Sequence, residues 1–224
     1  MGNYKAMLFD LDDTLVNRED AVDRIFSIVL EKCYGDVEDS MQEAMLKKFK
    51  AYDQRNYGNN DKLKIFEPFF AAFPPKQRLP VKDIQNFWDR TFPQCFSADE
   101  MTIKVIQTIK KHVQIAIITN GSTERQQAKI NNAQLDAYFE TIIISEEVGL
   151  LKPDQRIFDL TLSKLNVEPE EALYVGDHLV NDIFGSQHAN MKGIWFNPHR
   201  LENNTDIKPY AEIDSLDQLI QLVT

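Results

Sequence analysis

The second half of the sequence alternates between short apolar runs and amphipathic segments, and this alternation restricts the possible folds more than any other feature. β-Branched apolar runs predict strands at 112–120, 141–145, 172–177 and 193–197. Helical spacing predicts helices at 100–111, 123–132, 154–165, 181–189 and 215–223, with Ser97, Ser122 and Asp154 as candidate N-caps. Strands separated by helices of about ten residues indicate βαβ units and a parallel sheet covered on both faces.

A further buried strand is predicted at residues 6–9, but the chain does not continue with the same alternation. Instead, four segments with helical spacing of their apolar residues follow, at 21–30, 40–52, 63–73 and 81–92. In the second of them, Met41, Met45 and Phe49 form a stripe typical of a bundle core. We therefore expect an α/β protein with a Rossmann-like, doubly wound parallel sheet core formed by 1–16 and 98–224. A helical cap domain at 17–97 is inserted into it.

Composition narrows the class of protein. The formal net charge of −10 and pI near 4.9 argue against a nucleic-acid polymer or an anionic membrane as the main partner. Cys33 and Cys95 are the only cysteines, too few for a disulfide framework, which is typical of reduced thiols in a cytoplasm. No apolar run approaches the ~20 residues that cross a bilayer, and the first residues lack a signal segment. We expect a cytoplasmic protein with no membrane partner, present as a monomer or a homodimer.

Three carboxylates, Asp10, Asp12 and Asp13, lie within four residues directly after the first strand. Like charges this close repel each other, so the cluster costs stability unless a cation or a chemical task accounts for it. We interpret Asp13 as a turn residue.

Polar groups also follow the other strands, at the edge of a parallel sheet where ligands gather. They are Thr119 and Asn120 after the second strand, Lys152 after the third, and Asp177, His178 and Asp182 after the fourth. Several carboxylates with one lysine, and without a His or Cys cluster, suit Mg²⁺ and not zinc. Mg²⁺ held by few carboxylates leaves room for a substrate phosphate, whose oxygens a lysine and a threonine can hold. One aspartate can then act as a nucleophile and another as general acid and base.

Four segments, FDLDDT, IITNG, LKPD and GDHLVND, occur in this order and resemble the four motifs of the haloacid-dehalogenase-like (HAD) hydrolase superfamily. The helical insert directly after the first motif resembles the members of subfamily I, which have a helical C1 cap. The resemblance spans the whole chain. It implies a hydrolase that transfers a phosphoryl group to an aspartate and then to water.

The resemblance implies a role for each matching residue. Asp10 would attack phosphorus and bind Mg²⁺ through its carboxylate. Asp12 would protonate the leaving oxygen, activate the hydrolytic water and bind Mg²⁺ through its backbone carbonyl. Thr14 would fix the loop and orient this acid/base residue.

The later motifs complete the implied site. Thr119 and the backbone N–H of Asn120 would hold the phosphoryl group, and Lys152 would steady both the nucleophile and the transferred charge. Asp177 would complete the metal site, directly or through water, and Asp182 would support it from behind the ligands.

One position separates the branches of the superfamily. Haloacid dehalogenases do not keep an acidic residue two positions after the nucleophile, so Asp12 favours phosphate esters over 2-haloacids. Phosphonate hydrolases use a cap lysine, and we expect most of the cap lysines here, Lys47, Lys48, Lys50, Lys62 and Lys64, on solvated faces.

A non-catalytic regulatory or binding protein is a third alternative. It would have no reason to keep the charged cluster. A phosphoacceptor receiver domain does not suit an insert of about 80 residues.

The DLDDTL start and the GDHLVNDIFGSQHANMKGIWFN ending resemble the branch that includes pyrimidine 5′-nucleotidases. A nucleoside monophosphate, or a similar small phosphate ester, is therefore the expected substrate, with sugar phosphates and phosphoglycolate as open alternatives. Arg18 and the segment 55–60 are candidate substrate contacts, and His178 could either contact substrate or line the rim of the site. A cap hinged near 15–18 and 96–99 is expected to close over the substrate and exclude water.

Overall fold

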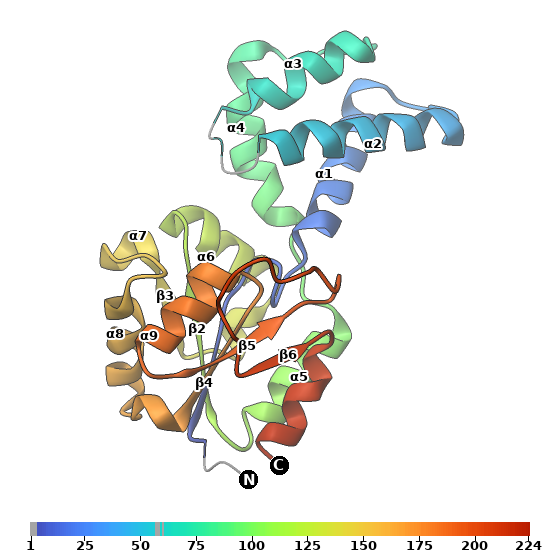
Figure 1. Ribbon diagram of the computed structural model, residues 1–224. Coiled ribbons are helices and arrows are strands. Elements are labelled where there is room, and N and C mark those ends of the chain that lie inside the picture. The colour runs from blue at the N-terminus through green and yellow to red at the C-terminus, as the bar shows by residue number, and fades with distance from the viewer. Residues whose placement is uncertain (1–3, 57–58, 60) are drawn as a thin grey trace. The chain divides into compact units, whose positions relative to one another are not determined.

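The computed structural model describes residues 4–56, 59 and 61–224 (Figure 1). The chain divides into two units. Met1–Asn17 and Ser97–Thr224 form the first, here named the core unit, and Arg18–Phe96 forms the second, here named the helical unit. In the described part of the chain, no helix combines the length and the apolar character that spanning a bilayer requires.

The core unit is built on a parallel sheet, as the alternating pattern predicts. Its six strands among the described residues are β1 (Ala6–Phe9), β2 (Gln114–Thr119), β3 (Thr141–Ile144), β4 (Ala172–Gly176), β5 (Lys192–Phe196) and β6 (Ala211–Ile213). They lie in the order β3-β2-β1-β4-β5-β6, and every neighbouring pair is parallel. β1 lies between β2 and β4, with Leu8 opposite Ala116 on one side and Tyr174 on the other.

Helices cover both faces of this sheet. They are α5 (Glu100–Ile109), α6 (Thr123–Asn132), α7 (Ser145–Val148), α8 (Gln155–Leu165) and α9 (Gly185–His188), with short turns η2 (Leu135–Ala137) and η3 (Pro169–Glu171). Leu8 and Tyr174 pack with Phe158 of α8 in one buried cluster. Across the sheet, the connection from β3 to β4 moves in the opposite direction to the connection from β1 to β2. Right-handed crossovers therefore place α8 and α5 on opposite faces.

Two predicted helices of the core unit have a different form. The segment expected as one helix at 181–189 is a π-helix, η4 (Leu179–Phe184), followed by α9. The segment expected at 215–223 is a 3₁₀-helix, η5 (Leu216–Leu222), which packs against α5 (Figure 1).

The candidate N-caps have different outcomes. Asp154 caps α8, because its carboxylate accepts from the Arg156 N–H. Ser97 is wrong as the cap of α5, where Asp99 accepts from the Thr102 N–H at 2.6 Å. Ser122 occupies the N-cap position of α6 without a capping hydrogen bond from its side chain.

The helical unit has an aromatic core. It contains α1 (Arg18–Cys33), α2 (Asp39–Arg55), α3 (Leu63–Ala72), α4 (Val81–Thr91) and the short η1 (Phe92–Cys95). The ring of Phe49 lies 5.6 Å from that of Phe26, 5.8 Å from that of Phe66 and 5.2 Å from that of Phe69, between centroids. Met45 is also buried, but Met41 is 47% exposed, so the predicted core stripe is wrong at its first residue. Its helix face turns to solvent there.

Charged residues of the helical unit include one buried pair and one buried lysine. Arg18 donates to both carboxylate oxygens of buried Asp53, at 2.6 and 2.9 Å. Lys62 is buried, contrary to the solvated position expected for most lysines here, and it donates to the carbonyl of Asn59 at 2.6 Å. In the candidate substrate segment 55–60, Arg55 is exposed, and residues 57, 58 and 60 lie outside the described residues.

We expect Phe49→Ala to lower the free energy of unfolding of the helical unit by about 3–5 kcal/mol, because it leaves a cavity among three aromatic rings. Urea denaturation followed by hydrogen exchange of peptides from 18–96 would measure the loss. Met41→Ala, on the same helix but half-exposed, is the matched control. Equal losses in the two variants would contradict a core centred on Phe49.

Candidate active site

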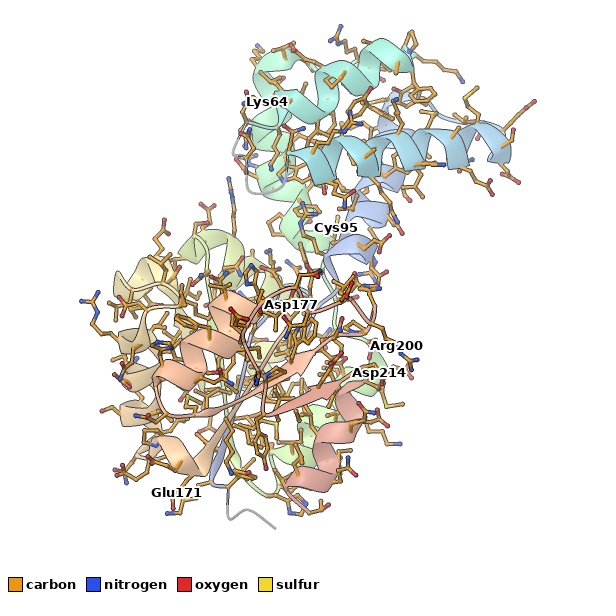
Figure 2. All side chains as sticks on the ribbon, in the orientation of Figure 1. Lys64, Cys95, Glu171, Asp177, Arg200 and Asp214 are labelled. Atoms are coloured by element: carbon orange, nitrogen blue, oxygen red, sulfur yellow. The ribbon has the colours of Figure 1, made fainter. Side chains whose placement is uncertain are left out.

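The carboxyl ends of three adjacent strands bring the predicted site residues to one edge of the sheet. Asp10 directly follows β1, Thr119 is the last residue of β2, and Asp177 directly follows β4. Figure 2 shows Asp177 at this end of β4 and Glu171 at the opposite end. Since β1 lies between β2 and β4, Asp10 is central among these groups.

Lys152 reaches this edge from the loop after α7 and uses all three donors of its ammonium group. Its Nζ lies 2.6 Å from Asp10 Oδ1, 2.7 Å from Asp182 Oδ1 and 3.0 Å from the Tyr174 hydroxyl. Only 3% of the Lys152 side chain is exposed. The ammonium is therefore saturated and fixed in a site that excludes water.

The charge on Lys152 is retained despite this burial. Burial disfavours the cation, but the attraction of Asp10 and Asp182 outweighs it and holds the pKa of Lys152 well above its ordinary value. Burial also raises the pKa of Tyr174 well above its usual range, so its hydroxyl stays protonated. Removing one partner of such a buried network typically costs about 3–5 kcal/mol, because the other charge is left unpaired.

Hydrogen bonds to the backbone of Lys152 fix its position. The Asn120 side chain, at the end of β2, donates to the Lys152 carbonyl at 2.9 Å and accepts from the Lys152 N–H at 2.8 Å. Nearby, the Gly121 N–H donates to Ser145 Oγ at 2.9 Å. These contacts tie the loop to the end of β2, which explains how a residue 142 positions from Asp10 meets it.

Asp182 is held equally firmly, from η4. Its Oδ1 binds Lys152, and its Oδ2 accepts from the His178 N–H at 2.9 Å. The His178 ring accepts from the N–H groups of Val180 and Asn181, so it caps η4. A Cβ on Gly176 would lie 2.4 Å from Asp182 Cγ, which only glycine avoids.

The site collects more negative charge than Lys152 balances. Carboxylate oxygens of Asp10, Asp177 and Asp182 lie within 4.8 Å of one another. Burial and nearby Asp182 raise the pKa of Asp10 to about 7, against the attraction of Lys152. Burial and the repulsion of Asp10 and Asp182 raise the pKa of Asp177 to about 8.

These oxygens fit the predicted magnesium site. Both oxygens of Asp182 are hydrogen-bonded, whereas in the described part of the chain no donor reaches the Asp177 carboxylate. A ligand set of carboxylates alone, partly without donors and with surplus negative charge, is what a hard divalent cation such as Mg²⁺ requires.

Asp12 turns toward α6. Its two carboxylate oxygens lie 2.7 and 2.8 Å from Lys129 Nζ, and Gln126 Nε2 donates to it at 3.0 Å. Thr14 Oγ1 is buried without a hydrogen-bond partner among the described residues, and the role of Thr14 in fixing the loop and orienting Asp12 stays a prediction. Asp13 has a φ of 58°, and its N–H donates to the Val16 carbonyl, as a turn residue does.

Sequence reasoning missed three residues at this edge: Gln126, Lys129 and Tyr174. Gln126 and Lys129 are three apart on the helix that follows Thr119, so they share a face, and this spacing was the available signal. Tyr174 has the only side-chain hydroxyl in the apolar run of β4.

Comparison with known proteins gives one family match and full-length relatives. The family model for haloacid dehalogenase-like hydrolases matches residues 7–196. A glyceraldehyde 3-phosphate phosphatase of Pyrococcus furiosus is 29% identical, over 100% of this chain and 94% of its own. The pyrimidine 5′-nucleotidase YjjG of Escherichia coli is 36% identical over 54% of each chain. The HAD-hydrolase YfnB of Bacillus subtilis, solved bound to magnesium, has a TM-score of 0.73 at 21% identity, covering 99% of both chains.

The raised pKa values predict how stability depends on pH without metal. In the unfolded chain, Asp10 and Asp177 titrate near their ordinary value of about 4. The folded protein therefore binds more protons between about pH 4 and pH 8, and its free energy of unfolding falls as pH rises through this window.

Between pH 5 and pH 8, we expect the free energy of unfolding of Asp177→Asn to fall by roughly 1–4 kcal/mol less than that of the unmodified protein. Urea denaturation in EDTA would measure this difference. Asp159→Asn, at an exposed position of α8, should keep the slope of the unmodified protein. An identical pH dependence in the two variants would show that Asp177 is not a source of the pH-dependent stability.

Proposed function

We propose, from the premise that the chain belongs to the haloacid dehalogenase-like hydrolase family, that it is a Mg²⁺-dependent phosphomonoesterase. One observation carries the proposal. A buried lysine is hydrogen-bonded to Asp10, and a second carboxylate, Asp12, lies two residues further at the same edge of the sheet. A nucleophile, a fixed cation and a separate acid/base group are the parts that phosphoryl transfer needs.

In the first displacement, an oxygen of the Asp10 carboxylate attacks phosphorus. A bond forms between that oxygen and phosphorus, and the bond from phosphorus to the leaving oxygen breaks. Asp12 gives its proton to the leaving oxygen, so that the product is a neutral alcohol. Lys152, fixed against Asp10 Oδ1, stabilises the charge that passes to the phosphoryl group.

In the second displacement, a water oxygen attacks the phosphorus of the aspartyl phosphate. Asp12, now a carboxylate, accepts the proton of this water, and the bond from phosphorus to Asp10 breaks. Inorganic phosphate leaves, and both aspartates return to their starting states. Dividing hydrolysis in this way lets one acid/base residue serve both steps.

The residues that would hold Mg²⁺ are the carboxylates of Asp10 and Asp177 and the backbone carbonyl of Asp12, with Asp182 behind them. When bound, the cation supplies positive charge that neutralises the repulsion within the cluster and the charge on the phosphoryl oxygens. The Thr119 hydroxyl and the Asn120 N–H would hold the remaining phosphoryl oxygens. Lys152, whose three donors already have partners, would act on these oxygens through its positive charge.

Asp12 separates this function from dehalogenation. A halide leaves without a proton, whereas the alkoxide of a phosphate ester needs one, so an acid at this position has a task only with an ester. A binding protein without activity would gain nothing from carboxylates whose pKa values burial raises to about 7 and about 8.

The proposed substrate is a small phosphate ester of the cytoplasm, such as a nucleoside 5′-monophosphate. The nucleotidase relative supports this class over half of the chain, and the full-length triose-phosphate phosphatase relative supports a phosphorylated sugar. Cys33 and Cys95 are buried free thiols, which suits a reducing compartment.

A panel of esters tests the proposal. We expect phosphate release from at least one of the pyrimidine and purine 5′-monophosphates, triose and other sugar phosphates, phosphoglycolate and p-nitrophenyl phosphate. EDTA should abolish release, and Asp10→Asn should lower it by at least about 10³-fold. Asp159→Asn, far along α8, should leave it unchanged.

Thermal unfolding of each variant would confirm that it is folded. Release from no ester, or release that survives Asp10→Asn, would refute the proposed function.

A further inference from the structure

We infer that Gln126 and Lys129 of α6 are positioning residues that hold the Asp12 carboxyl group where it exchanges a proton with the leaving group and with the hydrolytic water. The inference rests on the proposed phosphatase function, because it assigns these residues to the acid/base step of that reaction. Neither residue belongs to the four motif segments FDLDDT, IITNG, LKPD and GDHLVND.

The contacts of Asp12 carry this inference. Lys129 Nζ contacts both carboxylate oxygens, at 2.7 and 2.8 Å, and Gln126 Nε2 donates to Oδ2 at 3.0 Å. The exposed fraction is 13% for the Lys129 side chain and 22% for that of Asp12, so solvent only partly weakens the ion pair. Both side-chain donors to Asp12 in the described part of the chain therefore come from one helix.

Gln126 also joins Asp12 to the phosphate-binding part of the site. The same amide nitrogen donates to Thr119 Oγ1 at 2.5 Å, and both Gln126 and Thr119 are almost fully buried. One amide thereby sets the distance between the acid/base carboxylate and the hydroxyl proposed to hold the phosphoryl group. A shift of about 1 Å in such an arrangement can cost about 10²-fold in rate.

The backbone beside Gln126 is shaped to admit this side chain. Gly121 has a φ of 150°, and a Cβ there would lie 2.9 Å from both Cγ and Cδ of Gln126. A glycine between β2 and α6 is thus needed for the amide to lie between Thr119 and Asp12. This requirement is independent of the Asp12 contacts.

The loop that carries Asp12 does not fix its side chain by itself. Thr14 Oγ1, the nearby hydroxyl expected to orient it, is buried without a hydrogen-bond partner among the described residues. If both α6 donors are removed, rotation about the side-chain bonds of Asp12 is no longer opposed by a charged hydrogen bond.

Leaving groups of different basicity reveal a misplaced acid. An alkyl ester expels a strongly basic alkoxide and depends on the proton from Asp12, whereas p-nitrophenolate leaves readily without one. The value of kcat/KM reports only the steps through departure of the leaving group. The ratio of kcat/KM for an alkyl phosphate to that for p-nitrophenyl phosphate therefore isolates the placement of Asp12 from any loss of folded protein.

The test compares Lys129→Met and Gln126→Leu with the controls Lys104→Met, at an exposed position of α5, and Gln127→Leu, beside Gln126 on α6. We expect the alkyl-to-aryl ratio to fall about 10- to 100-fold in each of the first two variants and less than about 3-fold in the controls. Lys129→Arg should restore most of the ratio, because it keeps a cation beside Asp12.

A second background makes the test independent of stability. In Asp12→Asn, the ratio should already be low, and adding Lys129→Met should lower it no further, because the two residues act as one unit. If the ratio is unchanged in Lys129→Met and Gln126→Leu while the unmodified protein hydrolyses esters, the positioning role is wrong and the phosphatase function stands. If the unmodified protein hydrolyses no ester, the proposed function fails, and this inference fails with it.

Discussion

The site depends on one buried ammonium group. Lys152 Nζ joins Asp10 after β1, Tyr174 on β4 and Asp182 on η4, and so binds three separate parts of the chain at a single point. The Asn120 side chain fixes the Lys152 backbone from β2, which adds a fourth. The close approach of Asp182 to Gly176 follows from the same network. Because removing a charged partner leaves an uncompensated buried charge, the loss of any one of these charged side chains destabilises the site.

The two halves of the site differ in how well their groups are satisfied. All three donors of the Lys152 ammonium and both carboxylate oxygens of Asp182 have hydrogen-bond partners, so these two side chains are held in fixed positions. Asp10 and Asp177 are less well compensated, because burial and the repulsion of neighbouring carboxylates, including Asp182, raise the pKa of each. Buried carboxylates with raised pKa values are typical of catalytic sites, where a substrate or a cation compensates the remaining negative charge. Asp12 is a third case, since donors from α6 hold it apart from this cluster.

The sheet was predictable because strands buried on both faces are continuous apolar runs, and the polar residues that end them can only meet at one edge. β6 was missed because three residues with only Ile213 buried carry no periodic signal. Ser97 and Asp99 are both good capping residues two positions apart, and only the backbone geometry decides between them. Gln126 and Lys129 were missed because α6 is a polar helix: their spacing places them on one face, but it does not tell whether that face meets solvent or another charge. Hydrogen bonds between distant residues, such as Asn120 with Lys152, have no local signature at all.

In the proposed mechanism, Asp10 attacks phosphorus itself and is more than a metal ligand or a base for water. The stereochemical course at phosphorus tests this role, with an ester of the panel prepared as a thiophosphate that is chiral through ¹⁶O and ¹⁸O and is hydrolysed in ¹⁷O-labelled water. Two in-line displacements, first by Asp10 and then by water, each invert the configuration, so we expect net retention in the released thiophosphate. Net inversion would show a single direct attack by water, and would contradict the covalent role of Asp10.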